Sequence, residues 1–346
     1  MAADSAKPVH VLIVGTGAVG AFYGSRLHQP PHVLVSVTCR SNYQAVKRNG
    51  IALDTHSFGS YHFQPHAVYP SIEDAAKNAP RDFDFVVVST KALPDVSDDS
   101  AMIAPVIKSD GTSVVLIQNG VGVEESHRAR FPDNPILSAV TVVSAAQTEP
   151  GKIKQNRWTR ISVGPYCGEN VSRSLRDRST AVSKQFVQLL LDGGIKDAEE
   201  MDEQGLQLVR WHKLAINSSM NPSAVLSGGT GNSRMSLDSE LRRHLAGCMN
   251  EIFETAPKVL GREWPEKLKK ADAERILKSS ERNTEGLPSM LLDWQAGRPM
   301  EIEVILGNPI RIARKKDIEM PRLQTLYALL KMAAVRRTEE ARKAKL

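Results

Sequence analysis

Residues 9–20, VHVLIVGTGAVG, constrain the fold more than any other stretch of the chain. A run of branched apolar residues ends in a G-x-G-x-x-G pattern, and the residues after it have helical spacing. Gly15 suits a tight turn, Gly17 lets the backbone approach a pyrophosphate, and Gly20 allows close packing of the helix on the strand. An ordinary strand-to-helix turn is the simpler interpretation, but the context favours a dinucleotide site. We therefore predict cofactor contacts from the whole loop: Gly15, Thr16, Gly17, Ala18, Val19 and Gly20.

The first half of the chain alternates apolar β-branched runs with helical patterns. The predicted strands are 9–15, 32–40, 83–91, 112–120 and 136–145. Strands separated by helices predict βαβ units and a Rossmann-type, doubly wound parallel sheet. Residues 149–166 change to a Gly- and Pro-containing alternation, which predicts antiparallel edge strands.

From about residue 178 the pattern is almost wholly helical, with no internal repeat and no low-complexity linker. We therefore expect two domains, 1–177 as an NADP-binding Rossmann domain and 178–346 as an all-α substrate-binding and catalytic domain, with a cleft between them. A length of 346 residues suits two domains.

Composition narrows the class of protein. Hydrophobic residues make up 41% and charged residues 24%, as is usual for a soluble globular protein. The start, MAADSAKP, lacks the apolar segment of a secretory signal, and no apolar run approaches the ~18 residues of a membrane span. We expect a cytoplasmic protein without a membrane partner. Its three cysteines lack metal-ligand spacing, so no metal site is predicted.

The formal charge of +6 favours anionic ligands only slightly. Basic residues gather in AVRRTEEARKAKL, at the end of the sequence, without interleaved aromatic residues. This pattern is typical of a solvated helix end, where cations suit the helix dipole, rather than of a nucleic-acid groove. We expect a small-molecule 2-keto acid as partner and no nucleic acid, and both a monomer and a homodimer stay open.

The end of the second predicted strand, TCRSNYQ, distinguishes between the two nicotinamide cofactors. Sites for NAD usually place a carboxylate here to hold the ribose hydroxyls. This chain has Arg40 instead, and a guanidinium pairs well with a 2′-phosphate. We predict NADPH/NADP⁺, with Ser41 and Asn42 as helpers; the alternative is a surface arginine.

Two polar residues, Lys91 and Asn119, follow predicted strands at the carboxyl edge of the sheet, where ligands bind in this fold. A polar residue after a strand is also common in plain turns. Further on, Lys213, Asn217 and Asn221 are spaced to share one helix face, roughly 6 Å apart. A solvated stripe would favour Glu, Lys and Gln, because Asn is a poor helix former. The row therefore predicts hydrogen bonding to a ligand.

The segment LPSMLLDWQAGRPMEIEVILG places Ser289 and Asp293 on one helix face and Glu301 after a Gly/Arg/Pro break. Asp293 reads as a structural cap or salt-bridge residue. Glu301 is the natural partner for a catalytic lysine.

The glycine loop, STKA, IQNG, RWHKLAINSSMNP and PSMLLDWQAGRPMEIEVILG, in this order, resemble the ketopantoate reductases (2-dehydropantoate 2-reductases) over roughly residues 9–335. The most specific part is the Lys-x3-Asn-x3-Asn segment followed by the Ser-Met…Glu-Ile segment. The family resembles the 6-phosphogluconate dehydrogenase group in joining a Rossmann domain to a helical domain.

The resemblance implies NADPH-dependent reduction of 2-dehydropantoate to (R)-pantoate, in pantothenate and coenzyme A biosynthesis. It implies that Lys213 donates the proton and that Glu301 orients the amine, both as catalytic residues. The remaining roles that it implies are substrate binding by Asn119, Asn217, Asn221 and Ser289, and cofactor contacts from Lys91, Asn119, Glu301 and the backbone at Ala145, after the last Rossmann strand.

The sequence departs from the family pattern at two places. Some members have an asparagine about ten residues after the second Asn of the row; here Gly231 holds that position and Asn232 follows it. Pro309 lies in a segment expected to be helical, where it would break or kink the helix. Two alternatives therefore stay open: a reductase of another branched 2-keto acid, and a noncatalytic NADP(H)-binding sensor.

Overall fold

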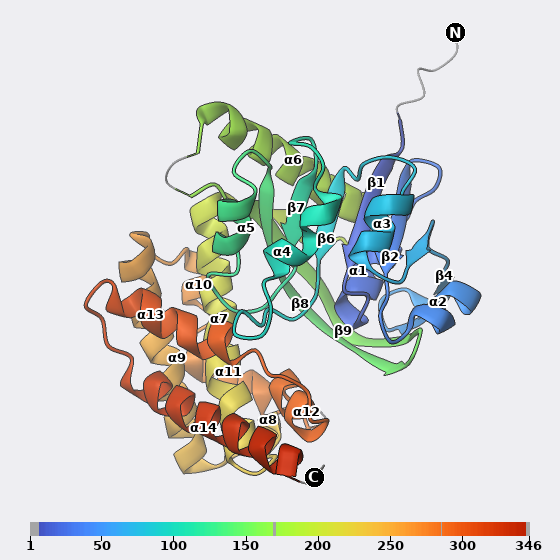
Figure 1. The fold of residues 1–346 in the computed structure, drawn as a ribbon. Helices are drawn as coiled ribbons and strands as arrows, with labels where there is room; N and C mark the ends of the chain where they lie inside the picture. Colours follow the sequence, from blue (N-terminus) through green and yellow to red (C-terminus); the bar gives the residue numbers. More distant parts are fainter. Residues whose placement is uncertain (1–6, 169–170, 285, 344–346) are drawn as a thin grey trace. The chain divides into compact units, whose positions relative to one another are not determined.

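The computed structural model describes residues 7–168, 171–284 and 286–343. These residues form two compact units (Figure 1). The sheet unit takes the chain up to residue 91, then 98–118 and 124–206. The helical unit takes 92–97, 119–123 and the chain from 207 onward. Two short loops that follow strands of the sheet thus belong to the helical unit.

The described residues of the sheet unit form one mixed sheet with the order β4-β3-β9-β8-β7-β6-β1-β2-β5, and β10 also pairs with β9. The strands are β1 Val9–Val14, β2 Val33–Thr38, β3 Ile51–Thr55, β4 Gly59–Phe63, β5 Val68–Tyr69, β6 Phe85–Val88, β7 Ser113–Leu116, β8 Ile136–Glu149, β9 Lys152–Pro165 and β10 Ala198–Glu200.

The central strands β2, β1, β6, β7 and β8 are parallel, which confirms the predicted doubly wound sheet. Every residue of β6 and β7 is buried, as their continuous apolar runs predict for central parallel strands. By contrast, β3 alternates buried and exposed residues and forms a hairpin with β4. The sequence interpretation missed this hairpin, although IALDT carries the period-2 signal.

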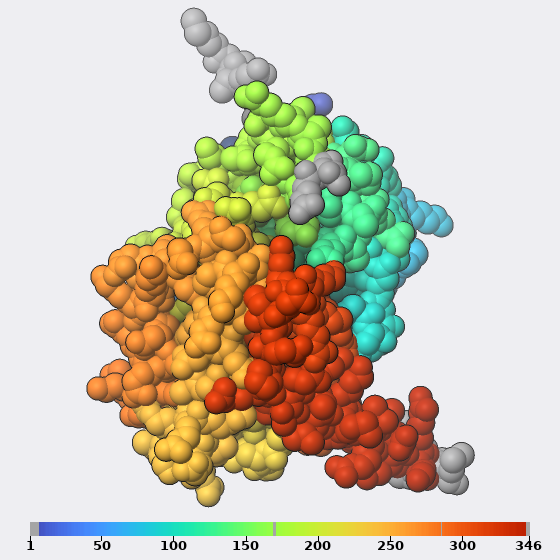
Figure 2. Space-filling model, turned by 90° about the vertical axis from the view of Figure 1, so that its left-hand side faces the viewer, coloured from blue at the N-terminus to red at the C-terminus, as the bar shows by residue number. Residues whose placement is uncertain are grey.

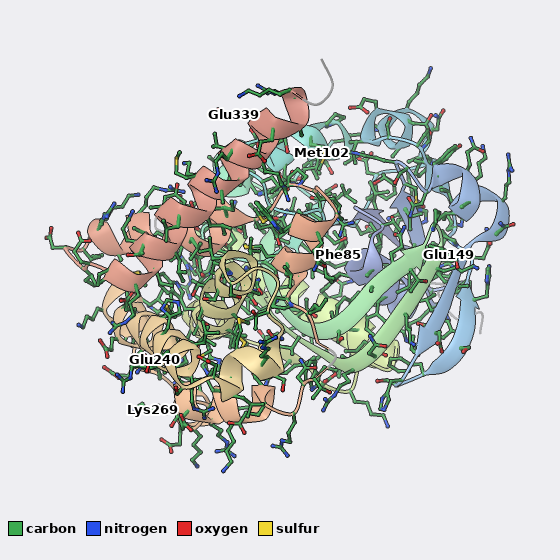
Figure 3. The ribbon with its side chains drawn as sticks, turned by 90° about the horizontal axis from the view of Figure 1, so that it is seen from below. Phe85, Met102, Glu149, Glu240, Lys269 and Glu339 are labelled. Carbon is green, nitrogen blue, oxygen red and sulfur yellow. The ribbon has the colours of Figure 1, made fainter. Side chains whose placement is uncertain are left out.

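The prediction of edge strands in 149–166 is correct in direction and wrong in position. β9 is antiparallel to β8, and Figure 3 shows the pair with Glu149 at its far end. However, β9 lies between β8 and β3 and is therefore internal. On the side of β9 away from β8, β3 pairs with residues 152–155 and β10 pairs with residues 161–163, so both ends of β9 have a neighbouring strand on each side.

The helices of the sheet unit are α1 Ala18–Leu27, α2 Tyr43–Asn49, α3 Ile72–Asn78, α4 Asp99–Ile103, η1 Ala104–Val106, α5 Glu125–Arg130 and α6 Arg173–Asp192. The predicted domain boundary at 177/178 falls inside α6. This helix packs its apolar face on the sheet, with the ring centroids of Phe186 and Phe85 5.2 Å apart. Helical composition therefore begins before the sheet unit ends.

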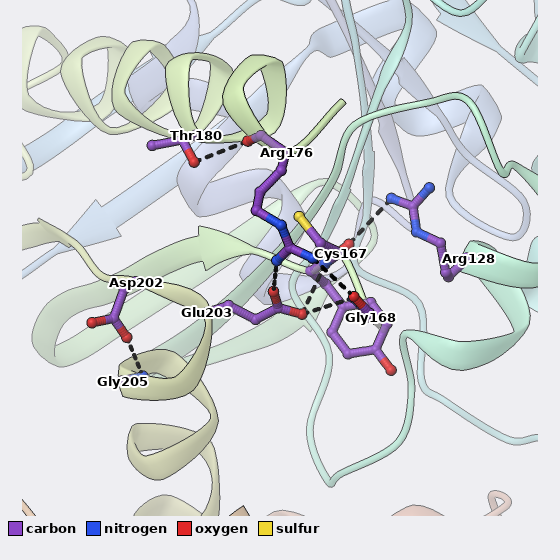
Figure 4. A network of polar contacts seen from close by, with 9 residues as sticks. Arg128, Cys167, Gly168, Arg176, Thr180, Asp202, Glu203 and Gly205 are labelled. Atoms are coloured by element: carbon purple, nitrogen blue, oxygen red, sulfur yellow. Dashed lines mark hydrogen bonds and ion pairs between the residues drawn. The ribbon is translucent and has the colours of Figure 1, made fainter. Parts of the chain in front are cut away.

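The first residues of α7 (Glu203–Leu226), up to Leu206, belong to the sheet unit, and Figure 4 shows the contacts that hold them there. The Glu203 carboxylate accepts hydrogen bonds from the backbone N–H groups of Cys167 and Gly168, both at 2.9 Å. Arg176 of α6 donates to the same carboxylate at 3.2 Å and to the Gly168 carbonyl. The end of β9 and the first turns of α6 and α7 thereby share one network.

The rest of α7 lies in the helical unit, which also holds α8 Asn232–Leu237, α9 Ser239–Leu260, α10 Glu266–Lys269, α11 Ala273–Ser280, α12 Ser289–Gln295, the π turn η2 Glu303–Gly307, α13 Asn308–Arg314 and α14 Pro321–Lys343. Figure 2 shows the orange surface of α9 to α11 beside the red surface of α14.

One apolar cluster fills the helical unit, with Trp211 of α7 among its largest buried side chains. Leu245 and Ile252 of α9 and Leu323 of α14 are fully buried in it. Polar side chains such as Glu240 and Lys269 point outward (Figure 3). Among the described residues, no helix is both long and apolar enough to cross a membrane.

Candidate active site

The glycine loop of the sheet unit has the geometry that its sequence predicts. Gly15 has φ +92°, and a Cβ on it would approach the Thr90 nitrogen to 2.7 Å. A Cβ on Gly20 would approach the Ser89 hydroxyl to 2.4 Å, whereas a Cβ on Gly17 would meet nothing within 4 Å. Gly17 is the N-cap of α1 and supplies no side chain to the first turn. The space beside Gly17 and the open helix N-terminus suit a pyrophosphate.

Thr16 is held inside the loop. Its hydroxyl donates to the Thr38 carbonyl at 2.8 Å, and the Asn42 amide donates to the Thr16 carbonyl at 3.2 Å. Asn42 is buried and therefore supports the loop from behind. Arg40 and Ser41 are exposed just after β2, and an Arg40 nitrogen lies 3.3 Å from the Met102 sulfur. The arginine is thus the side chain of this segment most available to an anion.

Two further predicted cofactor residues lie in the sheet unit. Lys91 is partly buried, three residues after β6. Ala145 was expected after the last Rossmann strand, but it lies within β8, which continues to Glu149, and it pairs with Gln155 of β9. The strand is longer than predicted because its outer half pairs with β9, and a register shift separates Ser144 from Ala145.

The helical unit brings Lys213, Asn119 and Glu301 together. The Lys213 Nζ donates to Asn119 Oδ1 at 2.8 Å, and Asn119 Nδ2 donates to Glu301 Oε2 at 3.0 Å. The other oxygen of Glu301 accepts the Ala92 backbone N–H at 3.2 Å. A single carboxamide therefore joins the amine to the carboxylate, a link that the sequence alone did not predict.

Burial and charge change the acidity of the lysine. Lys213 lies on α7 among the buried residues Trp211, Leu214 and Ala215. Desolvation, followed by the nearby charge of Arg210, lowers the pKa of Lys213 to about 8, while the Glu301 carboxylate opposes this shift. An amine with a pKa near neutrality gives up a proton far more readily than an ordinary lysine does.

The two asparagines of the predicted row follow Lys213 along α7. Asn217 is partly buried and Asn221 is 6% exposed. Within the part of the chain that the structure describes, neither side-chain amide has a hydrogen-bond partner. Ser289 is exposed at the first position of α12, beside the N-cap Pro288. Asp293 of the same helix pairs with Arg298 at 3.0 Å, as expected for a structural residue.

The backbone at 119–123, which we call the Asn119 loop, is fixed within the helical unit. Arg210 of α7, buried and 3% exposed, donates to the Gly120 carbonyl at 2.9 Å. The Val121 N–H donates to the Val304 carbonyl at 3.0 Å, and the Asn308 side chain donates to the Val121 carbonyl at 2.8 Å. Arg210 was overlooked in the sequence, although its i−3 spacing to Lys213 puts both on one face.

Pro309 does not end the helix. It lies in the first turn of α13, which continues from the π turn η2. The Asn308 N–H bonds to the Glu303 carbonyl, one residue further back than in an α-helix. This shift leaves the Val304 carbonyl to accept the Val121 N–H. The disruption expected from Pro309 therefore takes the form of a π turn that receives the Asn119 loop.

The other departure from the family pattern, at Gly231 and Asn232, lies at the start of α8. Gly231 is the N-cap of this helix and Asn232 its first residue. The Asn232 Oδ1 is buried and has no hydrogen-bond partner among the described residues.

Comparison with known proteins identifies the family. The model "Ketopantoate reductase PanE/ApbA" matches residues 11–168, and the model of its C-terminal domain matches residues 205–334. A 2-dehydropantoate 2-reductase from Nostoc sp. is 27% identical over 92% of this chain and 93% of its own length. An uncharacterized protein of Saccharomyces cerevisiae, YDL144C, is 28% identical over 92% of both chains.

Solved structures support the same family assignment. The 2-dehydropantoate 2-reductase of Methylococcus capsulatus has a TM-score of 0.79 and 31% identity, over 95% of this chain and 98% of its own. A D-mandelate dehydrogenase, solved with NADH and anilino(oxo)acetate, has a TM-score of 0.74 over 95% and 99% of the two chains. Its 21% identity shows the shared fold alone. The chain belongs to the ketopantoate reductase PanE/ApbA family, a family of oxidoreductases.

Proposed function

We propose that this protein reduces 2-dehydropantoate to (R)-pantoate with NADPH, a step of pantothenate and coenzyme A biosynthesis. The observation that carries the proposal is the Lys213–Asn119–Glu301 link, with two uncommitted carboxamides further along the lysine's helix. Family membership and relatives named 2-dehydropantoate 2-reductase support the choice of reaction.

Lys213 is the proton donor of the proposed reaction. NADPH, when bound, would supply a hydride to the C2 carbon of the ketone. The protonated Lys213 amine then transfers a proton to the C2 oxygen, and its charge stabilises the alkoxide as it develops. Glu301 acts on the amine through Asn119, which keeps the amine in place while its proton is transferred.

The substrate's carboxylate and hydroxyl are assigned to amide and hydroxyl groups of the helical unit. Asn217 and Asn221 have donors that are not used within the described protein, and the Ser289 hydroxyl is exposed. Asn221 is buried and Asn217 partly buried, and carboxamides removed from water without partners are costly unless a ligand completes their hydrogen bonds. The row on α7 therefore favours a polar, anionic substrate beside the lysine.

The glycine loop and Arg40 are assigned to NADPH. The space beside Gly17 and the open N-terminus of α1 suit the pyrophosphate, and the exposed guanidinium suits the 2′-phosphate. Lys91, Asn119, Ala145 and Glu301 complete the proposed set of cofactor contacts.

A reductase of another 2-keto acid is the second candidate. Asn232 is displaced by one position from the family pattern, and the D-mandelate dehydrogenase shares the fold. A noncatalytic NADP(H) sensor is less well supported, because a binding protein has no need of an amine whose pKa is lowered to about 8.

A panel of 2-keto acids, followed by the loss of NADPH absorbance, tests the proposal. We expect the fastest turnover with 2-dehydropantoate, and Lys213→Ala to lower kcat by roughly 10²- to 10⁴-fold while NADPH still binds. Lys278→Ala, at an exposed position of α11, is the matched control and keeps full activity. Unchanged turnover in Lys213→Ala contradicts the mechanism, and faster turnover of another acid selects the second candidate.

A further inference from the structure

Arg210 is a buried cation close to the lysine. It lies one helical turn before Lys213 on α7 and is only 3% exposed. A buried guanidinium is costly unless its N–H groups are bonded, and one of them donates to the Gly120 carbonyl at 2.9 Å. The helix that bears the lysine is thus attached directly to the loop that bears Asn119.

This attachment orients the side-chain oxygen of Asn119. Asn119 precedes Gly120, and its Oδ1 accepts the Lys213 amine at 2.8 Å. Two further backbone anchors of the Asn119 loop come from Val304 of η2 and Asn308 of α13. Those two contacts fix the loop relative to Glu301, and the Arg210 contact fixes it relative to Lys213.

The charge of Arg210 has a second consequence. Within the described part of the chain, three groups act on the amine: Arg210 from its own helix, Asn119 from the loop and Glu301 from the segment before η2. Arg210 lowers the pKa of Lys213 and Glu301 raises it. The position of the arginine therefore affects both the alignment of the Lys213 amine with Asn119 and the pKa of that amine.

We propose that Arg210 is a positioning residue of the reaction, which holds the Asn119 loop against α7 so that Asn119 stays aligned with the Lys213 amine. The inference rests on the proposed function and deepens it. Loss of the guanidinium then has two separable effects: a misaligned Asn119, which lowers kcat, and a less repelled ammonium, which holds its proton more tightly.

Three substitutions separate these effects. Arg210→Gln and Arg210→Met remove the charge, and Arg210→Lys keeps it with a single donor group. In both neutral variants we expect the loss of reductase activity at high pH to move upward by about one pH unit, with kcat lower by roughly tenfold. In Arg210→Lys we expect a similar loss of kcat, while the pH at which activity is lost on the alkaline side stays the same. Arg314→Gln, an exposed arginine of α13, is the control and changes neither.

A second measurement does not depend on turnover. Lysine ¹³Cε resonances are followed against pH in the full chain, with the Lys213→Ala spectrum assigning the signal. The Lys213 titration should move upward in the neutral variants and stay in place in Arg210→Lys. Unchanged kcat in all three variants overturns the positioning role. An unmoved titration and high-pH loss of activity in the neutral variants that fold, or an equal movement in Arg210→Lys, overturns the effect of the charge. If the wild-type protein reduces no 2-keto acid, the proposed function fails, while this titration still tests Arg210.

Discussion

Asn119 is chemically suited to stand between a lysine and a glutamate. An ammonium only donates hydrogen bonds and a carboxylate only accepts them, whereas a carboxamide does both. The two partners therefore fix the orientation of the Asn119 amide, with its oxygen toward Lys213 and its nitrogen toward Glu301. Aspartate at this position would repel the Glu301 carboxylate, and its own negative charge would hold the proton on the Lys213 ammonium.

Arg40 provides the test of cofactor choice at the scale of one residue. Arg40→Ala removes the exposed guanidinium that follows β2. We expect the KM for NADPH to rise by roughly 10- to 100-fold and the KM for NADH to change little, because only NADPH carries the 2′-phosphate. Arg48→Ala, an exposed arginine of α2, is the control. Steady-state kinetics with both cofactors measure the outcome, and equal losses for the two reject the phosphate role.

Single residues were predictable where their spacing is local. Lys213, Asn217 and Asn221 lie on one helix, so a four-residue period was enough to group them. The bond between Asn119 and Glu301 joins residues 182 positions apart, and no local pattern encodes it. The role of Arg210 depends on a backbone carbonyl 90 positions away, which has no sequence signature of its own.

At the scale of elements, the π turn explains a close backbone contact. Gly120 has φ +84°, and a Cβ on it would lie 2.4 Å from the Val304 carbonyl oxygen. The Asn119 loop therefore approaches η2 at a distance that only glycine permits. The sequence indicated a disturbed helix at Pro309, but not that the freed carbonyl would receive a loop, because periodicity reports buried faces rather than hydrogen-bond partners.

We predict that Gly120→Ala lowers the free energy of unfolding by about 2–5 kcal/mol, through both backbone strain and collision with Val304. Gly261→Ala is the matched control: its φ is +63°, but a Cβ there would meet nothing within 4 Å. It should cost about 1–2 kcal/mol, from strain alone. Urea unfolding measures both values, and equal costs would contradict the close packing of the loop.

At the scale of the whole molecule, the sequence predicted the fold class well, because buried strands and amphipathic helices carry strong periodic signals. It could not predict that residues 92–97 and 119–123 belong to the helical unit. Which unit such a loop belongs to depends on tertiary contacts, here those of Ala92 with Glu301 and of Val121 with Val304.

Hydrogen exchange tests this division. Leu245→Ala makes a cavity in the core of the helical unit and should destabilise it by about 2–5 kcal/mol. We expect exchange of the Val121 amide to speed up together with the amides of α9, while the amides of β1 in the sheet unit keep their wild-type rates. Acceleration confined to the helices would show that the Asn119 loop belongs with the sheet.

The helical unit is built from three separate segments of the chain, and this sets a rule for building chimeras in this family. Grafting only residues 207–346 onto another Rossmann half would move Lys213 and Glu301 but leave behind the asparagine that joins them and the Ala92 amide that braces the carboxylate. The transferable cassette is therefore three pieces of chain, 92–97, 119–123 and 207 onward, which have to be exchanged together.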